Sequence, residues 1–513
     1  MSGIVAELPQ RAAIGIAPEL MAMALDLQRL SEQASGGKAF AQIEGPIVDV
    51  CRRMGKWALE TALTSHPKAR PGQEHMCVRC GRRFRILRES QNRDFRSRVG
   101  PFSYNRPYGT CDFCKLSGAP MDFELGLPAV DVSIGVLERV CHAAVTSRSF
   151  ETAAEIMTVH DMVELSAKQV RVLAEGEGRR LVQERDRQVS AYQSRRLEVK
   201  AEQSPGLVVV CADGGRVQTR NGFAERGANG RAELSAANAL CDPALSEDRQ
   251  ERWKEDKIGV VYDAVAKPQP GAAYREYRGA KAKIKTYVAT MQSWETFGWM
   301  LRLEAERRGY ASAKSRLFLA DGASHIRGLK EHQFPEAVFI LDWAHAVEHL
   351  ANSAKAAFGE GTDQARHWYQ EHRQALWEGN VKEIIRDLER LSAQMGPPQK
   401  DDPDGSPRRV LHQNATSYFP NNSSVMDYPA YRAKGWPIGS GVAEGGVKQF
   451  GLRLKGSEKF WNVGGIDRDL EESEAPSSQT GAEEMLALAA LYHCEDGRWQ
   501  RHWNERGQPI RWK

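Results

Sequence analysis

Hydrophobic residues recur every three or four positions at the start of the chain and again after residue 130. Residues 1 to about 70 carry this spacing, as in APELMAMALDLQRL, and we expect helices there. Further helical segments follow between about 130 and 200. Ser149 or Thr152 begins one of them and Ser166 caps the next, so the pair resembles a helix-turn-helix unit. A plain helical hairpin fits the same pattern, and the long charged helix that follows is typical of a spacer or dimer helix.

The pattern changes at Ser204, because LVVVCADGG is a continuous apolar run of the kind found in strands buried on both faces. Four more strands are predicted at residues 258–266, 285–291, 315–323 and 337–345, with an amphipathic helix at 294–310. Three strands followed by alternating helices and strands predict a mixed sheet with an RNase H-like arrangement. The overall prediction is a multidomain α/β protein.

Six regions follow from these patterns. We expect an N-terminal helical region (1–70), a zinc-ribbon-like module (71–120), a helix-turn-helix-like and long-helix region (121–203), a catalytic domain in two parts (204–345 and 431–513) and an all-α insertion between those parts (346–430).

Composition is that of a soluble globular protein. The 513 residues are 41% hydrophobic and 27% charged, with a net charge of +4. We find neither a signal-peptide pattern nor an apolar stretch of roughly 20 residues, and therefore expect a cytoplasmic protein that does not engage a membrane.

Two CxxC pairs stand 30 residues apart, at Cys77/Cys80 and Cys111/Cys114. Four thiolates in two tight pairs suit a tetrahedral structural zinc site, and we expect short strands between the pairs. The intervening segment is strongly basic, which suits a polyanionic partner, although its arginines could equally solvate one face. Nine arginines there face only Glu89, Asp94 and Asp112: Arg79, Arg82, Arg83, Arg85, Arg88, Arg93, Arg96, Arg98 and Arg106.

Three carboxylates stand beside small residues: Asp213 in CADGG, Asp321 in LADGA and Glu444 in VAEGG. Asp213 and Asp321 each end a predicted strand, and neighbouring strands would bring them together. Hard oxygen ligands of this kind suit Mg²⁺ or Mn²⁺, and phosphoryl transfer with two metal ions needs them close together. Glu444 stands in the first turn of a predicted helix, and the basic residues that follow it recur at three- to five-residue steps and would largely line one broad side of that helix: Lys448, Arg453, Lys455 and Lys459.

These motifs together resemble the bacterial insertion-sequence transposases of the ISKra family, relatives of the Mutator-like DDE transposases. The resemblance includes CADGG, KEDKIGVVYDA, LADGASHI, IGSGVAEGGVKQFGLRLKGSEKFWN and the C-terminal GAEEMLALAALYHCEDGRWQRHWN. It implies that Asp213, Asp321 and Glu444 form a catalytic DDE triad and that Asp342 and His345 are accessory residues. Two glycines follow Glu444, where the family usually has a less flexible helix start.

The resemblance also implies the substrates and the setting. A nucleoid-associated bacterial enzyme would bind the terminal inverted repeats of a transposon, nick them hydrolytically and join the freed 3′-hydroxyl to target DNA, acting as a homodimer. The DNA contacts that we expect come from three segments: Arg82, Arg83, Arg85, Arg96 and Arg98; Lys168 and Arg171; and Lys448, Arg453 and Lys455.

Two alternatives remain open. The pentapeptide His345-Ala346-Val347-Glu348-His349 matches the HxxEH pattern of zinc metallopeptidases, in which both histidines bind zinc and the glutamate is the base. A DNA-binding regulator with an inactive nuclease fold would carry the same motifs without catalysis.

Overall fold

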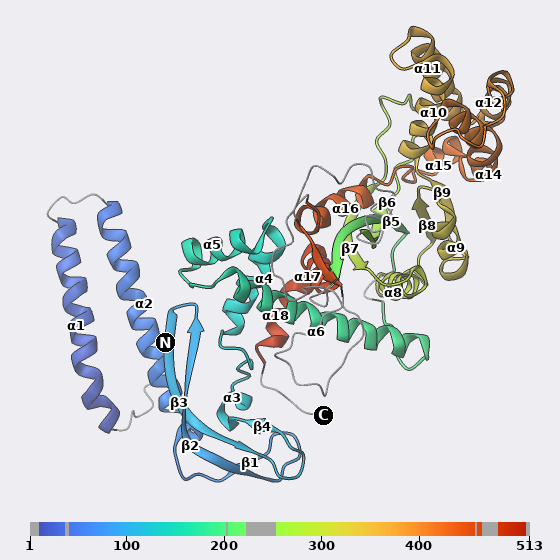
Figure 1. The fold of residues 1–513 in the computed structure, drawn as a ribbon. Coiled ribbons are helices and arrows are strands. Elements are labelled where there is room, and N and C mark those ends of the chain that lie inside the picture. Colours follow the sequence, from blue (N-terminus) through green and yellow to red (C-terminus); the bar gives the residue numbers. More distant parts are fainter. Residues whose placement is uncertain are drawn as a thin grey trace, which may run out of the picture. The chain divides into compact units, whose positions relative to one another are not determined.

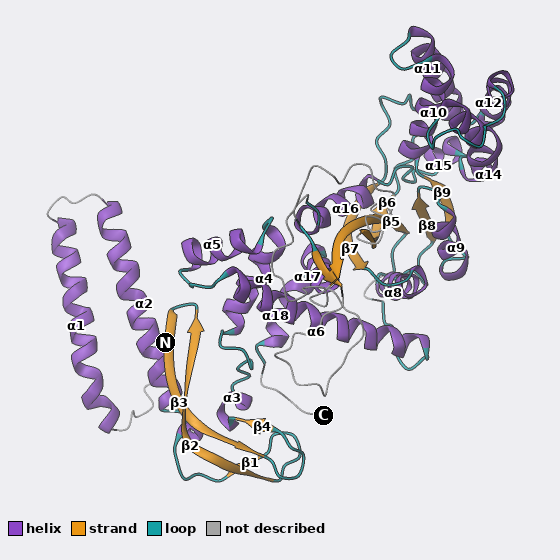
Figure 2. Cartoon of the chain, viewed as in Figure 1, coloured by secondary structure: helices purple, strands orange, loops and turns teal. Residues whose placement is uncertain are grey.

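The structure is a computed structural model that describes residues 10–35, 40–201, 204–221, 253–456, 459–463 and 481–508. The chain divides into two compact units, one formed by Met1–Ala144, Ser149–Leu173 and Gln500–Lys513 and the other by Val145–Arg148 and Ala174–Trp499. Figure 1 labels the helices and strands, and Figure 2 shows that helix is the commoner structure. None of the described helices is long and apolar enough to cross a membrane.

The first unit begins with two helices, α1 (Gln10–Ser35) and α2 (Phe40–Thr64), as the apolar spacing predicted. A four-stranded antiparallel sheet follows, in the order β1 (His75–Met76), β2 (Arg83–Ser97), β3 (Gly100–Thr110) and β4 (Ser117–Gly118). The prediction of short strands was wrong for β2 and β3, which are 15 and 11 residues long. Three buried aromatic residues of these strands, Phe95, Phe102 and Tyr104, form a small hydrophobic cluster with Met121, which follows the sheet.

Four helices follow this sheet along the chain: α3 (Pro120–Glu124), α4 (Ile134–Thr146), α5 (Phe150–Asp161) and α6 (Ala167–Gln193). Ser149 caps α5, because its hydroxyl accepts a hydrogen bond from Thr152 N. Ser166 and Gln169 form a reciprocal cap at the start of α6, each side chain accepting from the other's backbone N–H at 3.2 and 2.9 Å. The predicted helix starts are therefore confirmed, and α6 is a 27-residue helix.

The second unit is built on a mixed sheet. Five strands lie in the order β7-β6-β5-β8-β9, and the short β10 (Trp461–Val463) pairs with β5. Central β5 (Leu207–Asn221) is antiparallel to β6 (Trp253–Val265) and parallel to β8 (Ser315–Ala320). The outer strands are β7 (Lys281–Thr290) and β9 (Val338–Leu341). The sequence therefore predicted these five strands and the mixed α/β class correctly.

Helices cover both faces of this sheet. On one face, α8 (Trp294–Arg307) and α9 (Ser324–Gln333) pack on Val208, Val210 and Phe318. On the other face, α16 (Gly441–Leu454) lies against β5 and β6. Gly446 permits its close approach, because a Cβ there would come 2.7 Å from the Tyr287 ring. The second glycine after Glu444 therefore has a packing role.

The described residues between β9 and α16 contain helices and no strand: α10 (Trp343–Phe358), α11 (Asp363–Glu378), α12 (Val381–Met395), α13 (Pro407–Gln413), a π-helical turn (Asn414–Tyr418), α14 (Phe419–Asn422) and α15 (Tyr428–Ala433). Tyr428 joins this helical region to the sheet, because its hydroxyl donates to Leu341 O of β9 at 3.2 Å. Trp343, the first residue of α10, packs beside it and lies 4.9 Å from Tyr428 and 5.0 Å from Trp377, measured between ring centroids.

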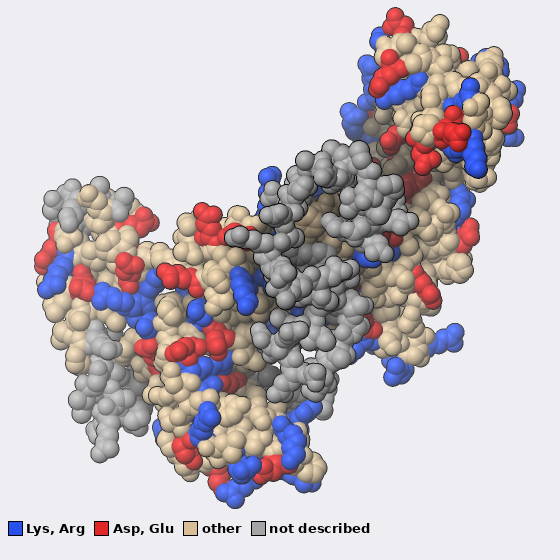
Figure 3. All heavy atoms as spheres, in the orientation of Figure 1, with Lys and Arg blue, Asp and Glu red and all other residues tan. Residues whose placement is uncertain are grey.

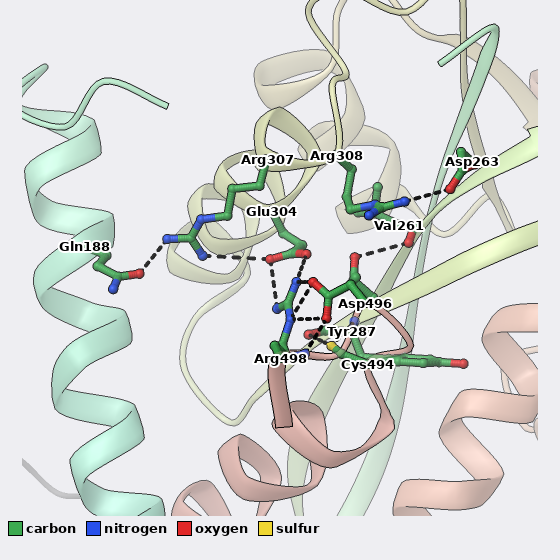
Figure 4. A network of polar contacts seen from close by, with 11 residues as sticks. Gln188, Val261, Asp263, Tyr287, Glu304, Arg307, Arg308, Cys494, Asp496 and Arg498 are labelled. Atoms are coloured by element: carbon green, nitrogen blue, oxygen red, sulfur yellow. Dashed lines mark hydrogen bonds and ion pairs between the residues drawn. The ribbon is translucent and has the colours of Figure 1, made fainter. Parts of the chain in front are cut away.

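The C-terminal segment after α17 (Gly481–His493) covers the edge strand β7. Glu495 N donates to Lys285 O at 2.9 Å, and Tyr287 N donates to Cys494 Sγ at 3.1 Å. Arg498 starts α18 (Arg498–Arg506) and lies between the carboxylates of Glu304 and Asp496 (Figure 4). This buried network attaches the segment to α8 and removes a free sheet edge.

Candidate functional site

The four cysteines of the CxxC pairs come together at one end of the antiparallel sheet. Cys77 and Cys80 lie in the turn between β1 and β2, and Cys111 and Cys114 lie in the turn between β3 and β4. The turns have the same geometry, since Gly81 and Lys115, each four residues after the first cysteine, have positive φ of 70° and 62°. Each of these residues also donates its backbone N–H to that cysteine's carbonyl at 2.9 Å.

The sulfur positions fit a tetrahedral metal. All four Sγ atoms lie within 4.8 Å of one another, with separations of 3.5 Å for Cys77–Cys114 and Cys80–Cys111. Zinc bound about 2.3 Å from each sulfur would hold the sulfurs about 3.8 Å apart. Within the cluster the backbone N–H of Cys114 holds the pKa of Cys111 down to about 6, whereas burial and the neighbouring sulfurs outweigh the Arg82 and Leu116 N–H groups and raise the pKa values of Cys80 and Cys114. The cluster is therefore a candidate metal site suited to zinc.

The arginines between these turns are not equivalent. Arg93 and Arg106 are buried and both bind the Asp122 carboxylate, at 2.9 and 3.2 Å, so they do not contribute to a surface cationic field. Arg82, Arg83, Arg85 and Arg98 are exposed, and Arg96 is half-buried. Arg85 is paired with Asp112, and Arg83 with Glu74. Figure 3 correspondingly shows acidic side chains interspersed among the basic ones on this unit.

Asp213 and Asp321 lie on two neighbouring parallel strands. Asp321 directly follows β8, as predicted, but Asp213 lies within β5, which continues to Asn221, so the prediction that Asp213 ends its strand was wrong. The last paired residues of these strands are Cys211 and Leu319, so both aspartates stand two positions further on in the same register. Each carboxylate is fixed locally: Asp213 Oδ1 accepts from Gly214 N at 2.7 Å, and Asp321 Oδ1 accepts from Ala323 N at 3.0 Å.

The charges of Glu444 and His345 act on Asp213. Burial raises the pKa of Asp213, and the negative charges of Asp321 and Glu444 act in the same direction, whereas the Gly214 N–H and His345 oppose them. Glu444 lies in the first turn of α16, as predicted, and Ser440 Oγ donates to its Oε1 at 3.4 Å. Asp213 is thus a carboxylate whose charge is destabilised by its surroundings, a situation that a bound cation would relieve.

Asp342 holds two backbone segments together. Its carboxylate is fully buried, caps α10 by accepting from His345 N at 3.0 Å, and also accepts from Ser440 N at the start of α16. Both oxygens therefore bind backbone N–H groups. This geometry gives Asp342 a positioning role, since it ties the strand end that precedes His345 to the helix that carries Glu444.

Asp213 and Asp321 line one cavity of about 830 Å³. Other polar and aromatic side chains of its wall were not singled out from the sequence: Arg216, Trp253, Glu255 and His325. Glu255 accepts hydrogen bonds from Trp294 Nε1 at 3.0 Å and pairs with Lys257 at 3.2 Å. A signal was available, because the charged string KEDK precedes the apolar run of β6, and antiparallel pairing sets it beside GGRV of β5.

Not every predicted DNA contact is available at the surface. Lys168 and Lys448 are exposed, and Arg171 is half-buried. Arg453, one of the predicted DNA contacts, is buried, donates to Arg148 O at 3.3 Å and lies over the Trp461 ring, so it is not available at the surface of α16. Lys455 points at Asp256, with 3.9 Å between Nζ and Oδ1.

The HxxEH histidines do not form a zinc site. His349 Nδ1 bonds Asn414 Oδ1 at 2.8 Å and its ring stacks on Tyr418, while His345 Nδ1 lies 3.9 Å from Glu348. Within the described parts of the chain, only the four cysteines bring three or more potential ligand atoms within 4.8 Å of one another. The three carboxylates are more widely spaced than that.

No known protein family matches the chain, and no curated protein matches it significantly.

Proposed function

We propose that the chain is a DDE transposase that binds transposon-end DNA and catalyses metal-dependent strand cleavage and 3′-OH strand transfer. The observation that carries the proposal is the register of β5 and β8, which sets Asp213 and Asp321 side by side on the wall of a single cavity. Glu444 lies close enough for its charge to act on Asp213. The mixed sheet with an antiparallel first pair and parallel β8 and β9 is compatible with an RNase H-like catalytic domain interrupted by the helical region.

Mg²⁺ or Mn²⁺ would be held by the oxygens of Asp213, Asp321 and Glu444, and would supply Lewis-acid activation of water and of the leaving oxygen. The protein's contribution is positional. β5 and the end of β8 fix the two aspartates, Asp342 fixes the start of α16, and His345 provides a nearby base or cation that moderates the negative charge at Asp213. In-line displacement at phosphorus depends more on charges fixed around the phosphate than on a covalent bond from a protein side chain.

DNA would be held by the exposed arginines of the β2–β3 ribbon, which we interpret as a zinc ribbon, and by the α5–α6 pair, with Lys168 exposed at the start of α6. Phosphate contacts of this sort provide affinity and register, and base recognition needs further side chains. Two ends must be processed together, so we propose a homodimer as the working form.

The test uses a supercoiled plasmid that carries the DNA flanking the coding sequence, incubated with the full-length chain and Mg²⁺ or Mn²⁺. We expect nicks at the element ends that depend on metal. Asp213→Asn, Asp321→Asn and Glu444→Gln should each abolish nicking while end binding in a gel-shift assay persists. Undiminished metal-dependent nicking by any one of these variants would refute the assignment of that residue.

One observation favours a second function, that of a DNA-binding regulator with an inactive nuclease fold. The three carboxylates do not approach one another as closely as the four thiolates do. Specific end binding without metal-dependent cleavage, in the wild type as in the three variants, would support this function over transposition.

A further inference from the structure

A fourth carboxylate, Asp256, lies on the same sheet face as Asp213 but away from the cavity wall. It is in β6, opposite Gly215 of β5, and its side chain is completely buried. Among the described residues neither of its oxygens accepts a hydrogen bond. A buried carboxylate without donors is costly, so its retention calls for a compensating charge.

That charge comes chiefly from Lys455, the residue directly after α16, with a smaller contribution from Lys257. Lys455 Nζ lies 3.9 Å from Asp256 Oδ1, and the Lys455 side chain is about one-third exposed, at 33%. Gly215 makes the meeting possible. A Cβ at this position would come 2.7 Å from Asp256 Oδ1 and would collide with Lys455 Nζ, so any other residue would push the ammonium away from the sheet.

The contact between Asp256 and Lys455 therefore restrains α16, the helix that carries Glu444. The start of α16 is fixed by Asp342, which accepts from Ser440 N, and its middle is fixed by Gly446 and Phe450 against Tyr287. Lys455 is the C-cap residue, and its pairing with Asp256 fixes the remaining end over β5 and β6. We propose that Asp256 and Lys455 are positioning residues that hold α16 in the place where Glu444 can share a metal with Asp213.

This inference rests on the proposed function for the role of Glu444, but the anchoring of α16 can be measured without any activity. Hydrogen exchange of the α16 amides, followed by mass spectrometry, reports local opening of the helix. We expect Asp256→Asn and Lys455→Met each to speed exchange in α16 by about tenfold, with α17 unchanged. The double variant should exchange no faster than either single variant, because both singles break the same contact.

Matched variants separate this contact from a general effect of charge. Lys455→Arg keeps a cation within reach of Asp256 and should retain wild-type protection. Lys448→Met, on the same helix but with an exposed ammonium, should leave α16 exchange unchanged. Gly215→Ala should reproduce the Lys455→Met result by displacing the ammonium. If a single variant fails to fold, the double variant, in which neither partner is charged, keeps the comparison possible.

The catalytic readout is nicking of the plasmid under varied Mg²⁺. A displaced Glu444 should lower kcat by about tenfold or more and raise the half-saturating Mg²⁺ concentration, with the KM for DNA unchanged. Unaltered α16 exchange in Asp256→Asn and Lys455→Met would overturn the inference, and so would a rise in KM alone, which would make Lys455 a DNA contact. Absence of nicking in the wild type would refute the proposed function, while the exchange data would still decide whether the anchor exists.

Discussion

Replacing Arg498 with methionine should destabilise the second unit more than any surface substitution. Its guanidinium donates to Glu304 at 2.6 and 3.2 Å and to Asp496 at 2.8 to 3.0 Å (Figure 4). The Glu304 side chain is only 3% exposed and that of Asp496 7%. Removing one partner of a buried ion pair leaves uncompensated charge and costs about 3–5 kcal/mol in the free energy of unfolding.

The cost should depend on pH. In the wild type Glu304 is desolvated, but Arg498 outweighs that effect and keeps the pKa of Glu304 below its ordinary value. Its stabilising contribution is therefore present above the unfolded pKa and is lost as pH falls through the folded pKa. Without Arg498, Arg307 remains 3.8 Å from Glu304, a longer contact that we do not expect to offset desolvation. The pKa of Glu304 should therefore rise, and the variant should lose stability as pH rises from about 4.5. We expect the difference from wild type to be larger at pH 8 than at pH 5.

Urea unfolding followed by tryptophan fluorescence measures these differences. Arg366→Met is the matched control, because Arg366 is paired with Asp363 at 3.0 Å on the surface and should change stability by about 1 kcal/mol or less. Adding Glu304→Gln to Arg498→Met should recover about 1–2 kcal/mol, since one stranded carboxylate is neutralised. A pH-independent difference, or a double variant no more stable than the single one, would refute the reasoning.

Three further predictions concern other parts of the chain. Cys77→Ser should abolish stoichiometric zinc, measured by elemental analysis of the purified protein, and weaken end binding; full zinc content would show that Cys77 is not a ligand. Burial, only partly offset by Arg179, raises the pKa of Glu484 to about 7, so folding stability from this group falls as pH rises from about 4.5 to 7 and is constant above. Glu484→Gln should therefore raise the Tm relative to wild type more at pH 8 than at pH 5, and an equal change at both would contradict this. Gly446→Ala should lower the Tm and nicking together, because its methyl group meets the Tyr287 ring, and a fully active, equally stable variant would show that α16 adjusts freely.

The sheet was predictable from the sequence because its central strands are buried on both faces. β5, β6 and β8 contain unbroken apolar runs. The residues after the run mark the end of β8 closely, but the DGG after the run of β5 lies within that strand, which continues to Asn221. The parallel pairing of β5 with β8 is then enough to bring Asp213 and Asp321 together. The two cysteine turns were equally predictable, since the CxxC spacing is a local feature of the sequence.

Long-range charge pairing was not predictable. Arg93 and Arg106 were counted with the surface arginines, because nothing local shows that both bind Asp122, which lies beyond the second cysteine pair. Arg453 and Lys455 had the spacing of an exposed helical face, yet one is buried and the other meets a carboxylate from β6. Periodicity identifies the faces of a helix, but the partner across each face is set by the tertiary structure.

The C-terminal string GAEEMLALAALYHCEDGRW shows which motifs bear on chemistry. Glu483 accepts from Arg185, Thr290 and Met291, at 2.5 to 2.7 Å, and in a separate contact Arg498 pairs with Glu304. These polar residues hold α17 and the edge strand β7 in place. A similar string in another chain would therefore indicate a shared fold and would say nothing of the chemistry. Asp213 and Asp321 instead accept hydrogen bonds from nearby backbone N–H groups, those of Gly214 and Ala323, and both line a cavity. Charged groups that stabilise nothing nearby are the ones that need a functional explanation. The case for metal chemistry therefore rests on these two aspartates. Whether Glu444 acts with them depends on how well α16 is held in place.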